Sequence, residues 1–253
     1  MTEREIIRHI DHGANLYISL FGAAEHMDIL DAGAYRFVHP KAGEQGISFV
    51  YDIRIEDLPA PEQQRIIDEI KALGVPCWVS LTASDGVFRR FFSTDRPHGQ
   101  KSFDDDDEQY LAMQPEDFID GDGAYDIRRV QTPEEFAIWA AIANEMLAGG
   151  RLDIHPAQHY VWITHRLMAC YVLYQNGAPA SIAATISDHG ISSLELVSTL
   201  PTFQRQGLAR AVCRQAVREA LSDGAHLITV RANGAASSRV YQAIGFKVCN
   251  VAI

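Results

Sequence analysis

The spacing of apolar and polar residues divides the first half of the chain into alternating strands and helices. β-Branched and aromatic residues over 46–55 predict a strand, and residues 75–81 predict another. Between them Pro61 opens a segment with an apolar face of helical period, which Gly74 ends. That face consists of Ile66, Ile67, Ile70 and Leu73. This half therefore predicts an α/β domain.

The second half repeats the alternation with sharper boundaries. A short strand over 125–130 precedes Thr132-Pro133-Glu134-Glu135, which has the pattern of a helix N-cap with a capping box. Residues 167–174 and 179–187 predict two strands joined at Asn176-Gly177, a typical hairpin turn. Further elements follow as an extended segment over 194–199, a helix over 208–221, a strand over 226–230 and a helix over 236–244.

Composition limits the class of protein. The chain has 253 residues, 47% of them apolar, which favours two domains of ordinary size. It contains no apolar run of about 18 residues, so we expect no membrane span. The four cysteines are scattered without a Cys-x-x-Cys pair, which favours a reducing cytoplasm and no zinc site.

Charge is unevenly distributed along the chain. Residues 1–124 hold 11 Lys and Arg against 24 Asp and Glu, a net charge of −13, whereas residues 125–253 hold 11 against 9, a net charge of +2. We therefore expect an acidic domain over 1–124 that ends in an acidic linker over about 93–124, and a second domain over 125–253. The acidic first half disfavours nucleic-acid binding, because contact with phosphates requires clustered Lys and Arg.

Residues 204–209 form the stretch with the clearest chemistry. The extended segment that ends at Thr199 is followed by the polar turn Gln204-Arg205-Gln206-Gly207 and then by the helix that begins near Leu208 and Ala209. The first N–H groups of a helix lack internal partners and lie at the positive end of its dipole, so they favour an anion such as phosphate. Gly207 allows the backbone to approach such a ligand closely. Arg205 could add a charge-assisted contact.

Two segments resemble the GNAT superfamily of acyl-CoA-dependent N-acyltransferases. Residues 204–209 fit the family's diphosphate loop, Gln/Arg-x-x-Gly-x-Gly/Ala, and residues 237–246 resemble its closing segment, in which a Tyr is followed four residues later by Gly-Phe. The resemblance implies an α/β (mixed α+β) GNAT fold over 125–253, with a central, mixed and splayed β-sheet flanked by helices. Residues 1–124 lack both motifs. They could be a degenerate second copy, as in tandem members of the family, or an unrelated α/β domain.

The resemblance also implies a set of functional residues. The hydroxyl of Tyr241 would donate a proton to the sulfur of coenzyme A, and Glu195 would be the general base, although it could equally be an outward-facing strand residue. The pantetheine arm would lie along Val197, Ser198 and Thr199, with a backbone N–H near Val197 stabilising the oxyanion. The diphosphate would bind at Gln204, Arg205, Gln206, Gly207, Leu208 and Ala209. Asn233 and Ser237 would also contact the cofactor, but Gly234 stands where the family commonly has the Asn.

These residues imply an enzyme, and the scattered cysteines favour a location in the cytoplasm. The expected function is transfer of the acetyl group of acetyl-CoA to a primary amine of a small molecule or peptide, and the acidic first half favours a cationic acceptor. An alternative is a non-catalytic module that senses acyl-CoA. A nucleotide-dependent oxidoreductase is disfavoured because no Gly-x-Gly-x-x-Gly follows a strand.

Overall fold

A computed structural model describes residues 1–46, 48–73, 77–79, 108–121, 123–147 and 152–249. The chain divides into two compact units. One comprises residues 1–13 and 107–250 and is called the C-terminal unit below; the other comprises residues 14–106 and 251–253 and is called the N-terminal unit. Helix α1, Glu3–Ser19, contributes its first part to the C-terminal unit and its last part to the N-terminal unit.

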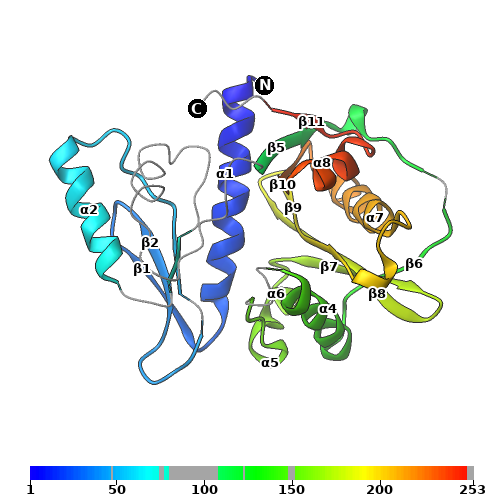
Figure 1. The fold of residues 1–253 in the computed structure, drawn as a ribbon, viewed down its shortest axis with the longest axis horizontal. Coiled ribbons are helices and arrows are strands. Elements are labelled where there is room, and N and C mark those ends of the chain that lie inside the picture. Colours follow the sequence, from blue (N-terminus) through cyan, green and yellow to red (C-terminus); the bar gives the residue numbers. More distant parts are fainter. Residues whose placement is uncertain (47, 74–76, 80–107, 122, 148–151, 250–253) are drawn as a thin grey trace. The chain divides into compact units, whose positions relative to one another are not determined.

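The N-terminal unit contains a four-stranded sheet in the order β1-β2-β3-β4 (Figure 1). Its strands are Met27–Asp31, Arg36–Pro40, Ser48–Tyr51 and Cys77–Val79. The pairings are antiparallel except for the last, between β3 and β4, which is parallel. A 3₁₀ turn, Leu20–Ala23, precedes β1, and helix α2, Ala60–Ala72, buries three of the four predicted apolar residues, Ile66, Ile67 and Ile70. The expected strand, helix and strand of this half are therefore present.

The C-terminal unit contains a seven-stranded mixed sheet in the order β11-β5-β10-β9-β8-β7-β6. In chain order its strands are β5, Glu108–Met113; β6, Asp126–Arg129; β7, Ala169–Gln175; β8, Ala178–Asp188; β9, Ile191–Thr199; β10, Leu227–Asn233; and β11, Lys247–Val248. All neighbours pair antiparallel except β9 and β10, which run parallel. The sheet is mixed, as the resemblance implies.

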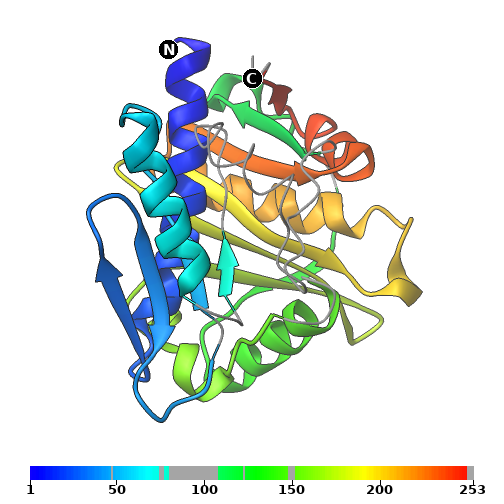
Figure 2. The same ribbon diagram turned by 60° about the vertical axis from the view of Figure 1, so that its left-hand side comes forward.

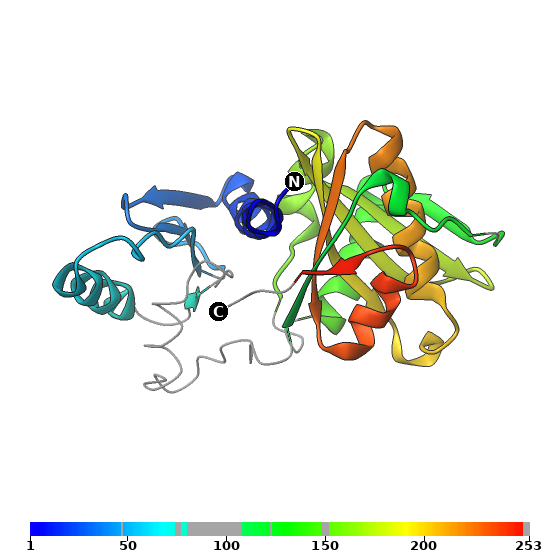
Figure 3. The ribbon, with the colours of Figure 1, turned by 90° about the horizontal axis from the view of Figure 1, so that it is seen from above.

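Helices and short turns connect these strands. They are the 3₁₀ turns Pro115–Asp117 and Pro201–Phe203 and the helices α4, Pro133–Met146; α5, Pro156–His159; α6, Val161–Thr164; α7, Leu208–Ser222; and α8, Ala235–Gln242. Figure 2 shows α7, in orange, running across the strands of the sheet. Figure 3 shows α7 and α8 on the same side of the sheet, which is seen nearly edge-on.

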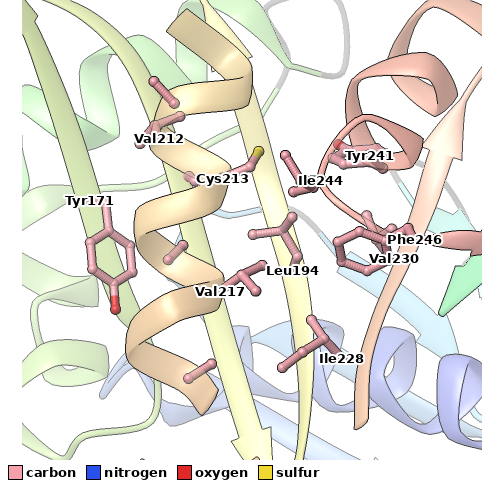
Figure 4. Packing of buried hydrophobic residues seen from close by; sticks show 14 of the residues in the cluster. Tyr171, Leu194, Val212, Cys213, Val217, Ile228, Val230, Tyr241, Ile244 and Phe246 are labelled. Carbon is pink, nitrogen blue, oxygen red and sulfur yellow. The ribbon is translucent and has the colours of Figure 1, made fainter. Parts of the chain in front are cut away.

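The main core of the C-terminal unit lies between the sheet and helices α7 and α8. Leu194 of β9, Ile228 and Val230 of β10, and Val212 and Val217 of α7 are all almost completely buried there (Figure 4). Because alternate residues of a strand point to opposite faces, Ser193 and Glu195 point to the face away from α7. This alternation places the polar residues of β9 outside the main core.

Residues 93–107 of the expected acidic linker over 93–124 lie outside the described residues, and the expectation is wrong for residues 108–113. Residues Glu108–Met113 form β5, which lies between β10 and β11 inside the sheet of the C-terminal unit. Tyr110, Leu111 and Met113 are buried there. The acidic neighbours of this short apolar run conceal its strand character in the sequence. Two arginines of α7 also hold the chain that follows β5. Arg218 forms an ion pair with Asp120, and the Arg214 side chain donates a hydrogen bond to the Ile119 carbonyl.

The capping box of α4 supports a stability prediction. Thr132 accepts a hydrogen bond from the Glu135 N–H, and the Glu135 carboxylate accepts one from the Thr132 N–H in return. Thr132→Ala removes a cap, so we expect the free energy of unfolding to fall by about 1 kcal/mol in urea titrations. The same change at the exposed Thr202, which caps no helix of comparable length, should alter it by less than about 0.5 kcal/mol. Equal effects at the two positions would contradict the capping role.

None of the helices among the described residues combines the length and apolar character that crossing a lipid bilayer requires.

Candidate active site

The parallel strands β9 and β10 separate partway along the sheet. Within the described residues they pair only between Ile191–Ser193 and Leu227–Thr229. Beyond this point β9 continues to Thr199 along β8, and β10 continues to Asn233 along β5. The backbone of each strand therefore turns alternate N–H and C=O groups toward the space between them, where an extended ligand can pair with them. This separation is the splay that the resemblance implies.

A β-bulge lies in β9 just beyond the separation. Ala184 pairs with Glu195 and Ile182 pairs with Ser198, so β9 has one residue more than β8 over this interval. Leu196 takes φ of 52°, which is uncommon for a residue with a side chain. Residues forced into this region cluster at functional sites. The bulge redirects the backbone at Leu196 and Val197, the position expected to offer an N–H to an oxyanion.

The predicted anion-binding loop has the expected form. Gly207 has φ of 79° and immediately precedes α7, for which it is the N-cap residue without a side-chain cap. Among the described residues, no backbone hydrogen bond runs from the N–H groups of residues 207–210 to a carbonyl, and the first backbone hydrogen bond of the helix runs from the Ala211 N–H to the Gly207 carbonyl. N–H groups at the positive end of a 15-residue helix have the geometry and charge that favour an anion.

Side chains around the loop fall into two groups. Gln204 and Gln206 stabilise the turn, because their Nε2 atoms donate to the carbonyls of Thr199 at 3.1 Å and Thr202 at 3.4 Å. Arg205 and Arg210 are exposed and form no ion pair with the described part of the chain. Arg210 Nη2 lies 3.7 Å from the position that a Cβ on Gly207 would occupy. Both guanidinium groups are therefore available to an anion at the helix terminus.

Tyr241 lies on α8 between the sheet and α7. It is 6% exposed, and its ring packs edge-on against Phe246 with 5.9 Å between ring centroids. Figure 4 shows its hydroxyl end directed toward α7, on the side where Cys213 lies. Burial raises the pKa of Tyr241 well above its usual range, and Cys213 and the Glu195 carboxylate add to the effect. The hydroxyl therefore stays protonated throughout the physiological pH range and can donate a proton.

Glu195 lies on β9 directly before the bulge, where it is partly buried. Its Oε1 accepts a hydrogen bond from Ser193 Oγ at 2.6 Å. The negative charge of Glu195 is one of the smaller causes, after burial, of the raised pKa of Tyr241. The carboxylate thus lies on β9 beyond the last residue that pairs with β10, and the phenol lies on α8.

The remaining predicted residues surround the same region. Ser198 accepts from Ser181 Oγ through its carbonyl at 2.8 Å, and the Thr199 hydroxyl is 2.8 Å from the same Oγ, so both are held against β8. Asn233 is exposed at the last position of β10, and Ser237 donates to the Gly234 carbonyl at 2.9 Å in the first turn of α8. Asn233 and Ser237 thus lie at the end of β10 and the start of α8.

Comparison with known proteins supports the fold. The family model described as "FR47-like protein" matches residues 171–252. A GCN5-related N-acetyltransferase from Kribbella flavida is 18% identical, with a TM-score of 0.59 over 95% of this chain and 92% of its own. This chain has a GNAT fold. No curated protein sequence matches it.

Two further GNAT structures align over most of the chain. A tandem GNAT protein from the clavulanic acid biosynthesis pathway is 10% identical, with a TM-score of 0.56 over 97% of this chain and 92% of its own. A GCN5-related N-acetyltransferase from Sphaerobacter thermophilus is 14% identical, with a TM-score of 0.54 over 87% of this chain and 79% of its own. The expected mixed GNAT sheet is therefore confirmed, whereas a degenerate GNAT origin for residues 1–124 stays a prediction.

Sequence reasoning missed two residues near the site, Ser193 and Gly13. Ser193 bonds the candidate base, and Gly13 of α1 lies against Ser193. The predicted extended segment begins at residue 194, one position too late to include Ser193; in β9, which begins at Ile191, the i, i+2 spacing puts Ser193 and Glu195 on one face. The approach of Gly13, 180 positions away in the chain, had no signal in the sequence.

Proposed function

We propose that this GNAT-fold protein transfers the acetyl group of acetyl-CoA to a primary amine. The observation that supports the proposal is the combination of N–H groups at residues 207–210 that lack a backbone partner with a splay of β9 from β10, in which β9 carries Glu195. A diphosphate at the α7 terminus and an extended pantetheine arm along Val197 to Thr199 are the two features of acetyl-CoA that this arrangement fits.

The residues divide the acyl transfer into separate tasks. The amine nitrogen forms a bond to the thioester carbonyl carbon, and the carbon–sulfur bond breaks. The Glu195 carboxylate accepts the proton that the amine loses, directly or through a water molecule, and the Tyr241 hydroxyl supplies a proton to the departing thiolate. A backbone N–H at the Leu196–Val197 bulge stabilises the negative charge on the carbonyl oxygen. Proton transfer from Glu195 back to Tyr241 through solvent restores both groups.

The acceptor is proposed at the level of chemical class. Residues 1–124 carry a net charge of −13, which favours cationic amines over neutral or acidic ones through long-range attraction. The panel in the test therefore contains polyamines, amino sugars, amino acid esters and peptide N-termini.

Release of free thiol from acetyl-CoA across that amine panel tests the proposal. Transfer requires thiol release that depends on the amine, together with an acetylated product found by mass spectrometry. Binding of acetyl-CoA without transfer to any amine would instead favour the alternative, a module that senses acyl-CoA. If acetyl-CoA neither binds nor releases thiol, both the acetyltransferase and the acyl-CoA sensor are rejected.

The proposed base leads to a prediction for Glu195→Gln. The substitution keeps the size and polarity of the side chain but removes its ability to accept a proton. We expect kcat/KM for the best amine to fall about a hundredfold near neutral pH, because general bases typically contribute factors of this order. The loss should shrink at high pH, where more of the amine is already neutral. A constant ratio from pH 6 to pH 10 would contradict the base assignment.

A further inference from the structure

Helix α1 rests directly on the sheet at the point where β9 and β10 separate. A Cβ added to Gly13 would lie 2.8 Å from Ser193 Cβ, 2.9 Å from Ser193 Oγ and 3.6 Å from Thr229 Oγ1. Ser193 and Thr229 are register partners and form the last paired position of the two strands. The backbone of α1 therefore touches the last residue pair before the splay.

Only a glycine allows this contact. Gly13 lies inside α1, where its φ is not positive, so its backbone conformation places no demand on the residue type. Glycine in a helix interior is less favourable than alanine. The close approach of Ser193 is thus the feature that accounts for glycine at this position, because a Cβ at 2.8 Å would force the helix or the strand to move.

The Ser193 side chain is enclosed between α1 and the strands. It is 5% exposed, and its neighbour Thr229 is fully buried with an Oγ1 that has no hydrogen-bond partner within the described residues. A side chain held this tightly has few rotamers available. Its Oγ donates to Glu195 Oε1 at 2.6 Å, a length typical of a charge-assisted hydrogen bond. The packing around Ser193 therefore orients its hydroxyl toward the Glu195 carboxylate.

We infer that Ser193 is a positioning residue for the Glu195 carboxylate and that α1 holds Ser193 in place through Gly13. This inference rests on the proposed role of Glu195 as the general base. The first part of α1 is then a component of the catalytic unit, although it stands at the opposite end of the sequence from the GNAT motifs. The hydrogen bond from Ser193 holds the carboxylate in one orientation on β9.

Titratable groups on α8, α1 and β10 also bear on the titration of Glu195. Tyr241 on α8 interacts electrostatically with it, and its hydroxyl is neutral at physiological pH because burial raises its pKa. Helix α1 carries Asp11, which is buried, and His12, whose Nε2 lies 2.8 Å from Asp188 Oδ2. β10 contributes Arg231. Substitution of Ser193 alters none of these charges, so a change in the titration of Glu195 reports the lost hydrogen bond.

The decisive experiment is an NMR titration of the Glu195 side-chain carboxyl in the full chain labelled with ¹³C-glutamate. The Glu195→Gln spectrum assigns the resonance. A hydrogen bond donated to the ionised form lowers the pKa of a carboxyl group, so Ser193→Ala should raise the Glu195 pKa by about one unit. Ser192→Ala is the matched control, because Ser192 is fully buried beside it but bonds Ser187 at 2.9 Å. That variant should leave the titration unchanged.

The acid limb of the pH profile of kcat/KM gives the second readout. With the best amine of the panel, Ser193→Ala should shift this limb to higher pH. The shift should equal the increase in the Glu195 pKa measured by NMR. Gly13→Ala should reduce kcat on the order of tenfold at unchanged acetyl-CoA affinity, since small misplacements of catalytic groups carry losses of that size. Arg8→Ala, at an exposed position of the same helix, should retain full activity.

The outcomes separate this inference from the proposed function. An unchanged Glu195 pKa in Ser193→Ala overturns the positioning role, whatever the activity of the protein. A raised Glu195 pKa in Ser193→Ala would support the hydrogen bond. If Glu195→Gln nevertheless kept full activity, Glu195 would not be the base, and the inference would fail together with that part of the proposed function. Full activity in Gly13→Ala overturns the part assigned to α1.

Discussion

Replacing Tyr241 with phenylalanine should lower kcat by about a hundredfold or more, because a positioned general acid contributes a factor of this order. The change removes one oxygen atom and leaves the ring, which packs against Phe246, in place. We therefore expect the affinity for acetyl-CoA and the melting temperature to stay close to those of the unaltered protein. Steady-state kinetics of thiol release and calorimetric titration with acetyl-CoA measure the two quantities separately.

The raised pKa of Tyr241 is compatible with the proposed role of its hydroxyl as a proton donor. A phenol with a pKa above its usual range is a weak acid, and proton transfer to an ordinary thiolate in water would be unfavourable. A thiolate beside Tyr241 is not in water, however. Burial also raises the pKa of the Cys213 thiol, which belongs to the same core cluster. The dry surroundings thus make the departing thiolate more basic as well, which brings the two groups closer in proton affinity.

The direction of the pKa shift of Tyr241 also predicts how activity and stability change at high pH. Because the folded pKa of Tyr241 is raised, its hydroxyl keeps its proton to higher pH than a tyrosine in the unfolded chain. The activity of the unaltered enzyme should therefore show no loss from ionisation of Tyr241 near pH 10. Burial of the neutral form stabilises the fold below the unfolded pKa, and this contribution is lost only as the pH rises through the folded value.

Tyr171→Phe provides the matched control. Tyr171 is buried on β7, and its hydroxyl donates to Glu219 Oε2 of α7 at 3.0 Å. The control removes a buried tyrosine hydroxyl that has a protein partner, so it should lower stability while leaving kcat unchanged. If Tyr241→Phe retains full turnover across the pH range, or if both variants lose the same activity, the acid assignment is wrong.

Local sequence patterns predicted much of the C-terminal unit, because its turns and caps depend on particular residue types. Asn176 and Gly177 adopt φ of 52° and 79° between β7 and β8, as an Asn-Gly hairpin requires. The capping box at Thr132 and the positive φ of Gly207 follow from the same kind of local chemistry. The loop of the candidate site could therefore be located from its sequence.

Features that depend on distant contacts were not predictable in this way. Leu196 at φ of 52° contradicts the preference of leucine, and only the pairing of β9 with β8 on one side and its separation from β10 on the other reveals the bulge. The sequence of strand β5 resembles a linker because acidic residues precede a short apolar run, yet the strand pairs with β10, more than 110 positions later. The contact of Gly13 with Ser193 belongs to the same class.

The largest expected effect on ligand binding comes from a negative charge at Gly207. Gly207→Asp and Gly207→Asn introduce side chains of nearly equal size at a residue with φ of 79°, a region that both tolerate better than most residues. The backbone strain and the lost access to the loop are therefore shared. The two variants differ by one negative charge, so their comparison isolates the electrostatic part of anion binding.

The charge should act in opposite directions on folding and on binding. A carboxylate at the start of α7 interacts favourably with the helix dipole, so the unliganded Asp variant should be as stable as the Asn variant or more stable by about 0.5 kcal/mol. A diphosphate with roughly two negative charges at about 5 Å would be repelled by about 1.7 kcal/mol even in a water-like dielectric. We therefore expect the Asp variant to bind acetyl-CoA about tenfold more weakly than the Asn variant at low salt.

Arg210 should reduce the difference in acetyl-CoA affinity between the Asp and Asn variants. Its Nη2 is 3.7 Å from the Cβ position at residue 207, so it would partly neutralise the new carboxylate and would itself be drawn away from the ligand. The difference between the two variants should then shrink at high ionic strength, where both the repulsion and the competition for Arg210 are screened. Calorimetric titrations at 20 and 500 mM salt measure it. Equal affinities of the Asp and Asn variants at low salt would mean that the diphosphate binds elsewhere, because no anion could lie at this helix terminus without responding to that charge.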